Sequence, residues 1–514
     1  KNSATHTNDL EKVLDKKLYD VPGTGQSVTW ADAVEGTLIL GATGSGKTSG
    51  PGKHAALAML EAGWGFCIMC AKTDEKDRWL KYAESTGRID DVVILNKESG
   101  YKFNFLTYEL TRDGEGSGEV INAINTIMNL NEQNKVYQSG AGGQGKEEPF
   151  WDQSLRRLIS RAITLLMITN EEVSISNMRE VVASCLKDDE PSIYFDLKET
   201  ATTEKEIDPE KREDARSKLS LWIKTSYFLQ LIEKLDKQAF NSDEDRREAL
   251  FVKNYWLREL PKVGERVLGI IIESFMGIIE PFISRGILKT QFSGGLDEEL
   301  LPETIINERK IVIVDYPIKE HGLAGIFASI IYKSTFMAAM ERRYIKEEAN
   351  PLPVCLWVDE YQNFCNPAAD TLFQTTARSS WVATVYITQN VNNMYFVMGH
   401  NNPIARAKSL LGNLNLKYFA SNADWDTNQW ASQMIGQTLT DFRTVNYKEN
   451  SADKRMDIST SKNQQMQYRI TPDHFTTLKT GRAANDNIVE AVVFKAGKLW
   501  GKEQSNFAIV EFKQ

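Results

Sequence analysis

The sequence predicts an α/β fold in which a mostly parallel central sheet is interrupted by an inserted all-α domain. Short apolar runs alternate with helical segments over residues 37–96, a pattern typical of a parallel sheet covered on both faces. Strand-like runs are almost absent from about 107 to 300, and they return after residue 310. A chain of 514 residues is also too long for one hydrophobic core, so two or three domains are expected.

The first part of the sheet domain is expected over residues 1–149. A helix through HAALAMLEAGW and a more polar helix, EKDRWLKYAEST, separate its strands. The three expected strands are TLIL (37–40), GFCIMC (65–70) and DVVIL (91–95). Each of them is short and apolar, as expected for a strand buried on both faces.

The inserted all-α domain is predicted over residues 150–290. Within FWDQSLRRLISRAITLLM, helical spacing is shared by Trp151, Leu155, Leu158, Ala162 and Leu165. This periodicity indicates a helix with one buried face.

Two stretches near or inside this domain have unusual compositions. Residues 267–283 are highly apolar, but they include Glu273 and Glu280, and a charged side chain at bilayer depth costs roughly 2.5 to 3.5 kcal/mol. A buried helix is therefore expected there. Residues 199–218 are densely charged and nearly free of apolar side chains, which indicates a solvated helix or loop. No transmembrane or signal segment is predicted.

The second part of the sheet domain, with a C-terminal extension, is expected over residues 291–514. Its strands are predicted at 310–316, 354–360, 382–388 and 416–422, with a peripheral strand at 488–497. Residues 436–466 are polar and lack clear periodicity, so a long exposed loop is expected there.

The composition is that of a soluble globular protein, with 41% hydrophobic and 25% charged residues. A formal net charge of -9 argues against a surface coated with basic nucleic-acid-binding residues, although a basic channel inside an acidic assembly is compatible with it. The five cysteines are scattered and imply no disulfide framework, which favours a reducing compartment. Cys67 and Cys70 form a CxxC inside an apolar strand, where buried packing is expected instead of metal binding.

A phosphate-binding loop is predicted at GATGSGKT, residues 41–48. The sequence satisfies GxxxxGK[ST] with an apolar strand before it and a helix after it. Glycines let backbone N–H groups converge on phosphate oxygens at the N-terminus of a helix. Lys47 is expected to reach the β and γ phosphates, and the Thr48 hydroxyl to bind Mg²⁺. The expected nucleotide-binding residues are Gly41, Gly44, Ser45, Gly46, Lys47, Thr48, Ser49 and Asp359.

A second glycine-rich stretch, GAGGQGKE at 140–147, has the same lysine spacing. Glu147 stands where the Mg²⁺-binding hydroxyl is required, and a carboxylate there would repel phosphate. No apolar strand precedes it, and Pro149 follows. We therefore expect a flexible loop, and a single nucleotide site in the chain.

Two predicted strands end in aspartate, which a P-loop enzyme needs to bind Mg²⁺ through water. Asp359 is followed by Glu360, whereas Asp315 is followed by Tyr316. Asp359 is therefore predicted to act with Thr48 at the metal, and Glu360 to be the general base for hydrolysis. Asp315 is expected to end a neighbouring strand.

A catalytic glutamate at this position favours a mechanical ATPase of the RecA-like class over a switch GTPase. Gln389 ends another predicted strand, VATVYITQN, where its amide is expected to sense the γ-phosphate. Arg378, in TTARSSW, has two open interpretations: a finger that reaches the nucleotide of a neighbouring subunit, or a surface ion pair. The expected cofactors are ATP and Mg²⁺.

The motifs resemble those of the coupling ATPases of type IV secretion, the TraG/TraD-like conjugation proteins within the FtsK/HerA group. The matching segments follow one another in the family's order over most of residues 30–490. They are GATGSGKTSG, CAKTDEK with Lys72, KFNFL with Asn104, PFWDQSLRRLI, LWVDEYQNF, ARSSWVATVYITQN, LLGNLNLKYF and MIGQT. The acidic-proline-lysine-glycine signature of the family is reduced here to Lys72, and Phe105 replaces the proline that usually follows the asparagine.

The resemblance implies a RecA-like P-loop NTPase interrupted by an all-α domain, which assembles as a homohexamer around a channel. It implies ATP-driven delivery of DNA, single- or double-stranded and bound without sequence preference, to a type IV secretion channel. Relaxase or effector proteins and secretion components at the inner membrane are the implied partners. The implied location is the bacterial cytoplasm, or the cytoplasmic face of the inner membrane if an anchor precedes Lys1.

Two other functions remain open on the residues alone. One is a soluble HerA-like DNA-translocating ATPase that works with a nuclease in DNA processing or defence. The other is an ATP-dependent assembly adaptor that recruits secreted proteins without moving DNA. One group of basic residues has two interpretations, either that it contacts DNA or that it forms a solvated face of a helix, and the solvated face is favoured. These residues are Lys253, Arg258, Lys262 and Arg266.

Overall fold

The chain divides into two compact units, each formed by segments that are distant in the sequence. The computed structural model describes residues 12–114, 117–139, 149–203, 208–240, 242–399, 402–450 and 455–514. The sheet unit comprises Lys1–Val93, Pro302–Asp315 and Phe336–Gln514, and the helical unit comprises Ile94–Leu301 and Tyr316–Thr335. The boundaries of these units differ from those of the predicted domains. The predicted boundaries, at 149/150 and 290/291, stay a prediction.

A nine-stranded sheet has the order β13-β12-β9-β3-β8-β7-β4-β6-β5. The strands from β9 to β6 in this order run parallel, while β12 and β13 are antiparallel additions beside β9. The predicted α/β class with a mostly parallel sheet is thus confirmed. The strands are β3 (Thr37–Leu40), β4 (Gly65–Cys70), β5 (Val92–Leu95), β6 (Ile311–Asp315), β7 (Val354–Val358), β8 (Val382–Thr388), β9 (Leu416–Ala420), β12 (Ile488–Lys495) and β13 (Phe507–Lys513).

The predicted strands all form, and among the described residues outside 436–468 three further strands were not expected. They are β13 and a small antiparallel pair, β1 (Lys17–Asp20) and β2 (Ser27–Thr29). The central strands β3, β4, β6, β7, β8 and β9 are buried along their whole length, as their continuous apolar runs predict. Cys67 and Cys70 are buried in β4, and the described residues hold no cluster of three or more metal-ligating side chains.

One helix of the sheet unit packs on this sheet through aromatic contacts. Trp79 of α4 (Glu75–Ser85) lies 5.4 Å from Phe66 of β4 and 5.2 Å from Trp357 of β7, between ring centroids. These contacts fix the start of α4 near the ends of both strands. The other helices of this unit are α2 (Trp30–Val34), α3 (Lys53–Glu61), α14 (Pro302–Asn307), α16 (Pro367–Thr376), α17 (Val391–Val397), α18 (Pro403–Gly412) and α19 (Trp425–Ile435).

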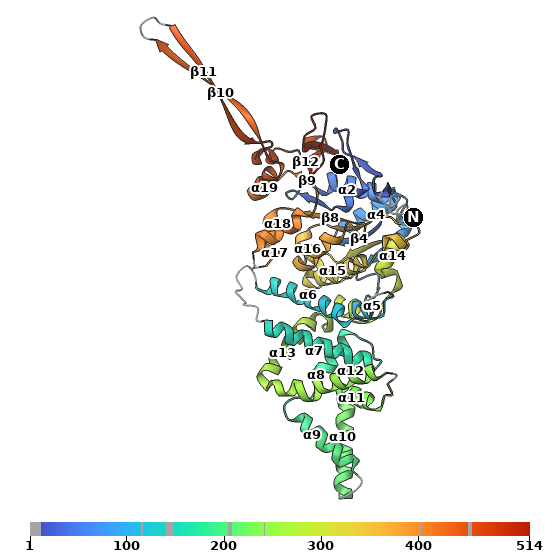
Figure 1. The fold of residues 1–514 in the computed structure, drawn as a ribbon. Helices are drawn as coiled ribbons and strands as arrows, with labels where there is room; N and C mark the ends of the chain where they lie inside the picture. Colours follow the sequence, from blue (N-terminus) through green and yellow to red (C-terminus); the bar gives the residue numbers. More distant parts are fainter. Residues whose placement is uncertain are drawn as a thin grey trace, which may run out of the picture. The chain divides into compact units, whose positions relative to one another are not determined.

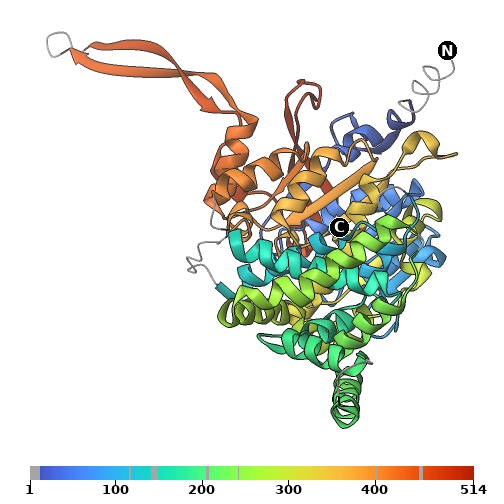
Figure 2. The same ribbon diagram turned by 60° about the horizontal axis from the view of Figure 1, so that its bottom comes forward.

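The helical unit contains no strand apart from the end of β5 among its described residues, as predicted. Its helices are α5 (Phe105–Thr111), α6 (Val120–Ser139), α7 (Pro149–Ile168), α8 (Ile175–Ala183), α9 (Glu190–Thr202), α10 (Pro209–Thr225), α11 (Tyr227–Lys237), α12 (Asp243–Asn254) and α13 (Glu265–Ile283). In α7 the four aliphatic residues of the predicted helical spacing are buried, whereas Trp151 is half-buried: Leu155, Leu158, Ala162 and Leu165. The charged stretch 199–218 forms the end of α9 and much of the largely exposed α10 (Figure 2).

The apolar segment 267–283 forms most of α13 and is amphipathic. Ile271, Phe275 and Ile279 are buried, whereas Glu273 and Glu280 are exposed, so the prediction of a buried helix holds for one face. Among the described residues, one helix is long and apolar enough to cross a membrane: α15 (Ile318–Glu341). However, 78% of its most apolar stretch is buried inside the protein.

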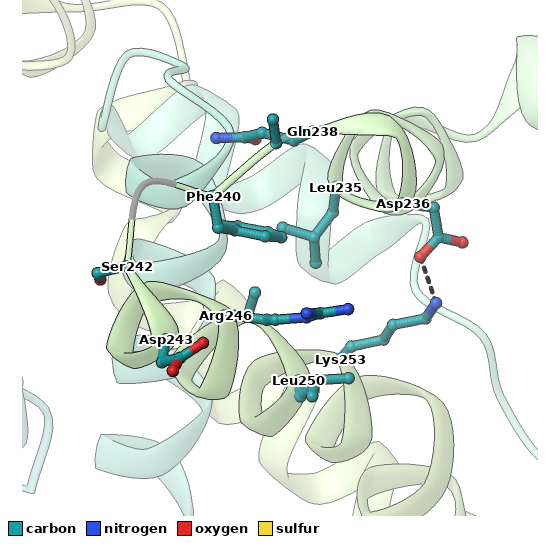
Figure 3. A pocket seen from close by; sticks show the side chains of 11 residues that line it. Leu235, Asp236, Gln238, Phe240, Ser242, Asp243, Arg246, Leu250 and Lys253 are labelled. Atoms are coloured by element: carbon teal, nitrogen blue, oxygen red, sulfur yellow. Dashed lines mark hydrogen bonds and ion pairs between the residues drawn. The ribbon is translucent and has the colours of Figure 1, made fainter.

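A pocket of about 700 Å³ opens between α11 and α12 in the helical unit (Figure 3). Leu235 and Phe240 form part of its apolar lining, and the Lys253 ammonium pairs with Asp236 at its edge. Of the basic residues considered for DNA contact, Lys253 is therefore in an ion pair. Arg258, Lys262 and Arg266 are exposed to solvent among Glu259 and Glu265.

The prediction of a long loop over residues 436–466 is wrong. The segment forms an antiparallel hairpin of β10 (Gln437–Asn450) and β11 (Arg455–Tyr468), which extends away from α19 (Figure 1). Its register places the exposed side chains of Leu439, Val445, Ile458 and Met466 on one face. The hairpin lacked a strand signal because backbone pairing forms it without burying either face, so no clear apolar alternation is needed.

The predicted flexible loop at 140–147 lies outside the described residues. Its interpretation as a loop without a nucleotide therefore stays a prediction.

Candidate nucleotide-binding site

The predicted phosphate loop joins the end of β3 to a helix, as the motif requires. A π-helical turn, Thr48–Gly52, begins directly after Lys47 and continues into α3. Gly44 and Gly46 have φ angles of 77° and 81°, which favour glycine. At Gly46 a Cβ atom would lie 2.4 Å from Cγ2 of Val489, so a side chain is also excluded by contact. The loop is held tightly in front of a helix N-terminus, the arrangement that binds phosphate.

Thr48 and Asp359 meet although they are distant in the sequence. The Thr48 hydroxyl donates a hydrogen bond of 3.1 Å to Oδ2 of Asp359, which directly follows β7. The other carboxylate oxygen, Oδ1, accepts a 2.8 Å bond from the backbone N–H of Glu360. Asp359 is only 3% exposed. A hydroxyl and a carboxylate held together beside a phosphate loop are suitable oxygen ligands for Mg²⁺.

Glu360 is held by side chains that follow the two strands flanking β7. Its Oε1 accepts a 2.6 Å hydrogen bond from the Lys72 ammonium, which comes after β4. Its Oε2 accepts bonds from the amides of Gln362 at 2.7 Å and of Gln389 at 3.2 Å, and Gln389 comes after β8. The backbone of Glu360 is left-handed, with φ 48°, an uncommon conformation for a residue other than glycine. Ends of three adjacent parallel strands therefore converge on one carboxylate.

Burial and ion pairing shift the pKa values of the charged side chains in this cluster in opposite directions. Burial lowers the pKa of Lys47 below its usual value, although the carboxylates of Asp359 and Glu360 oppose the shift. Burial would raise the pKa of Glu360, but the hydrogen bonds from Lys72 and Gln362 and the charges of Lys72 and Lys47 outweigh it, so the pKa is lowered. Glu360 is consequently an ionised carboxylate at neutral pH.

Glu75 also belongs to this cluster, although the sequence analysis did not select it. It is the first residue of α4 and 2% exposed, and its Oε2 accepts bonds from the backbone N–H of Ala71 at 2.7 Å and of Lys72 at 3.3 Å. Burial and the charge of Asp359 raise the pKa of Glu75 to about 8, against the opposing effect of those N–H groups. In the sequence, a glutamate in the first turn of a polar helix has no sign of burial, because such residues usually cap the helix in solvent.

Arg482 and Gln514 lie against the phosphate loop from the other end of the chain. A guanidinium nitrogen of Arg482 lies 3.2 Å from the position that a Cβ on Gly44 would take. The Gln514 side-chain amide donates a 2.6 Å bond to the Ser49 hydroxyl and accepts a 2.8 Å bond from the backbone N–H of Arg482. These contacts depend on the β12–β13 hairpin and had no sequence signal.

Arg378 and Asp315 lie apart from the cluster. Arg378 is exposed and lies 3.7 Å from the carboxylate of Glu35, which precedes β3, whereas the phosphate loop follows β3. Arg378 therefore lies toward the opposite ends of the strands, and its role toward a neighbouring subunit stays a prediction. Asp315 ends β6, where it forms an ion pair of 3.3 Å with Lys76. β6 is two strands away from β7 in the sheet.

Comparisons with known proteins match both part of the sequence and the whole fold. Residues 353–480, which include Asp359, Glu360 and Gln389, match the family model described as the TraM recognition site of TraD and TraG. A search of curated proteins found no match.

The fold is similar to solved structures of a plasmid coupling protein, TrwB. Its complex with the ATP analogue ADPNP matches with a TM-score of 0.59 at 13% identity, covering 98% of this chain and 91% of that one. Its complex with the GTP analogue GDPNP matches at 0.54 and 13% identity, covering 98% and 92%. Its complex with ADP and Mg²⁺ matches at 0.52 and 12% identity, also covering 98% and 92%. The resemblance to coupling ATPases of the TraG/TraD type, stated above from the motifs, is therefore supported by the family model over residues 353–480. The solved structures show in addition that nearly the whole chain shares their fold.

Proposed function

We propose that the protein is an ATP-hydrolysing coupling motor that recruits DNA or a nucleoprotein substrate and drives it into a type IV secretion channel during conjugation. The observation that supports this most directly is the convergence of Thr48, Asp359, Glu360 and Gln389 beside the phosphate loop. The family model over residues 353–480 favours coupling over work with a nuclease, because it describes TraD and TraG proteins.

The residues present fit a magnesium nucleotide. Thr48 and Asp359 would hold Mg²⁺, and the backbone of the loop and Lys47 would hold the phosphates. When bound, the metal neutralises charge that develops on the phosphate oxygens. An unpartnered buried oxygen of Glu75 beside Thr48 and Asp359 agrees with a site that binds a cation.

Glu360 is the proposed general base that takes a proton from the attacking water. The Gln389 side-chain amide donates to Glu360, and the backbone carbonyl of Gln389 accepts a 2.8 Å bond from the Asn422 amide. The side-chain amide of Gln389 is therefore held beside the base, where it can orient the water. Lys72 pairs directly with the base and is the proposed residue that controls its basicity. Arg482 adds a guanidinium beside the loop, where phosphate charge would lie.

Replacing Lys72 by methionine is expected to raise the pKa of Glu360, because the ion pair and hydrogen bond that lower it are removed. Glu360 acts as a base only when ionised, so the acidic limb of the turnover profile should move to higher pH. The check is kcat against pH at saturating ATP and Mg²⁺. Lys81→Met, an exposed lysine on α4, the helix that follows Lys72, is the matched control. An unchanged acidic limb in Lys72→Met would show that Lys72 does not tune the base.

The same pair makes stability depend on pH with a definite sign. Because the folded pKa of Glu360 is lowered, its ionised form stabilises the fold above the usual carboxylate pKa, and this contribution is lost as the pH falls through the folded value. Lys72→Met should reduce this acid dependence, measured by urea unfolding over the acidic range.

The proposed motor predicts ATP turnover that DNA stimulates, together with assembly into a homohexameric ring. The test measures turnover with no DNA, with single-stranded DNA and with double-stranded DNA of unrelated sequences, and inspects the particles by electron microscopy. Sequence-independent stimulation and a ring support the motor. Turnover with neither DNA response nor ring would point instead to an assembly adaptor, and absence of nucleotide binding would contradict the nucleotide site itself.

The proposed partners and location follow from the same proposal. Relaxase or effector proteins would be recruited, and components of the secretion channel would receive the substrate at the cytoplasmic face of the inner membrane. Co-purification with relaxase and with channel components after membrane fractionation tests both. Recovery of the full chain away from membranes and without these partners would contradict the coupling role.

A further inference from the structure

A small cavity lies beside the phosphate loop, entirely within the sheet unit. Thr48, Asp359 and Glu75 contribute polar side chains to it, and Trp79 and Trp357 contribute apolar walls. Thr48 and Asp359 already bind each other there. Glu75 thus lines the same small cavity as the two residues proposed to bind Mg²⁺.

One oxygen of Glu75 has no hydrogen-bond partner in this cavity. Its Oε2 satisfies the N–H groups of Ala71 and Lys72, whereas Oε1 is buried and unpartnered. A buried carboxylate oxygen without a partner is strongly unfavourable, so such atoms in native proteins usually face an ion, a water or a ligand. Holding the turn between β4 and α4 accounts for Oε2 alone.

Nearby cations do not supply the missing partner. The Arg78 guanidinium lines the cavity but donates a 2.8 Å bond to Asp74, and the Lys72 ammonium is directed to Glu360. The aromatic contacts of Trp79 with Phe66 and Trp357 hold the first turn of α4 in place, so Glu75 is fixed in its position. The cavity is therefore lined by Thr48, Asp359 and a fixed Glu75 whose Oε1 has no partner.

We propose that Glu75 is a third polar side chain of the magnesium site, which binds the hydration shell of the metal beside Thr48 and Asp359. This inference rests on the proposed function, because it requires that a magnesium nucleotide occupies the site. Carboxylates are preferred partners of hydrated Mg²⁺, which keeps several of its waters when it binds proteins. Backbone contacts of Glu75 with Lys72 would also couple the metal to the position of the lysine that pairs with Glu360.

Mn²⁺ binding to the full chain in the presence of ADP tests the proposal without any catalytic step. Free Mn²⁺ is measured by electron paramagnetic resonance during titration, and ADP affinity is measured separately in EDTA with a fluorescent ADP analogue. Glu75→Gln keeps an oxygen for the Ala71 and Lys72 N–H groups but places an amide donor where Oε1 stands. The expected result is Mn²⁺ affinity about 10- to 100-fold weaker, the usual effect of losing such a supporting residue, with ADP affinity in EDTA unchanged.

Glu84→Gln, an exposed glutamate on the same helix, is the matched control and should bind Mn²⁺ as the wild type does. Glu75→Asp keeps a carboxyl group but withdraws it by one methylene, so its Mn²⁺ affinity should fall between those of the wild type and Glu75→Gln. This variant also provides the test if Glu75→Gln does not fold. Wild-type Mn²⁺ affinity in the folded variants, even with lowered thermal stability, would overturn the proposal and leave Glu75 only the role of holding the turn before α4. A wild type without Mn²⁺-dependent ADP binding would contradict the proposed function instead.

Discussion

Glu360→Gln is expected to lower ATP turnover by about 10²- to 10⁴-fold, the usual contribution of a general base, while nucleotide binding persists. The amide has nearly the shape of the carboxylate, so its oxygen can still accept the bond from Lys72. It cannot take a proton from water at neutral pH. Of the variants considered for this site, it removes the chemical step most selectively.

The measurement for Glu360→Gln is steady-state turnover together with equilibrium binding of ATP. Glu61→Gln, an exposed glutamate at the end of α3, is the matched control and should leave both quantities unchanged. Turnover close to that of the wild type in a folded Glu360→Gln variant would remove Glu360 from the role of base. Loss of ATP binding in that variant would indicate instead that Glu360 organises the site.

Lys47→Ala is expected to weaken ATP binding by about 10- to 100-fold, since a hydrogen bond to a charged group contributes roughly 1.5 to 3 kcal/mol. Lys47 is 5% exposed and feels the charges of Asp359 and Glu360. Without its ammonium, those carboxylates would repel the phosphates unopposed, so turnover should fall to background. The variant should still fold, because burial already disfavours the charged lysine.

Binding of a fluorescent ATP analogue and turnover at high ATP concentration are the two measurements for Lys47→Ala. Lys53→Ala, at the first residue of α3, is the control for removal of a nearby positive charge. Substantial turnover in Lys47→Ala would contradict a single nucleotide site. The stretch at 140–147, with its similar lysine spacing, would then be the next segment to test.

Several features could be predicted from the sequence because they depend on contiguous residues. The strands at 37–40, 65–70 and 354–358 are short apolar runs, and burial on both faces leaves that pattern in the sequence itself. The phosphate loop likewise carries its glycines, lysine and threonine in one segment. The expectation that Thr48 and Asp359 act together agrees with their hydrogen bond, because ends of parallel strands meet at one edge of the sheet.

Other features had no contiguous signal. The hairpin at 437–468 forms through backbone pairing and keeps its side chains in solvent, so its composition is that of a loop. Arg378 lies toward the opposite ends of the strands because of the path that the chain takes after α16. The local sequence around Arg378 does not determine that path.

The sequence by itself determined the class of the fold, the phosphate loop and the candidate pair Asp359 and Glu360, because each depends on local pattern and chemistry. Tertiary structure decided which side chains surround that pair: Lys72 on Glu360, Glu75 in the cavity, and Arg482 beside the loop. Their burial and partners arise from segments that are distant along the chain. A charged residue is the same in the sequence whether it is exposed to solvent or buried in a site. Its pKa and its ion-pair partners are set only by the tertiary packing around it.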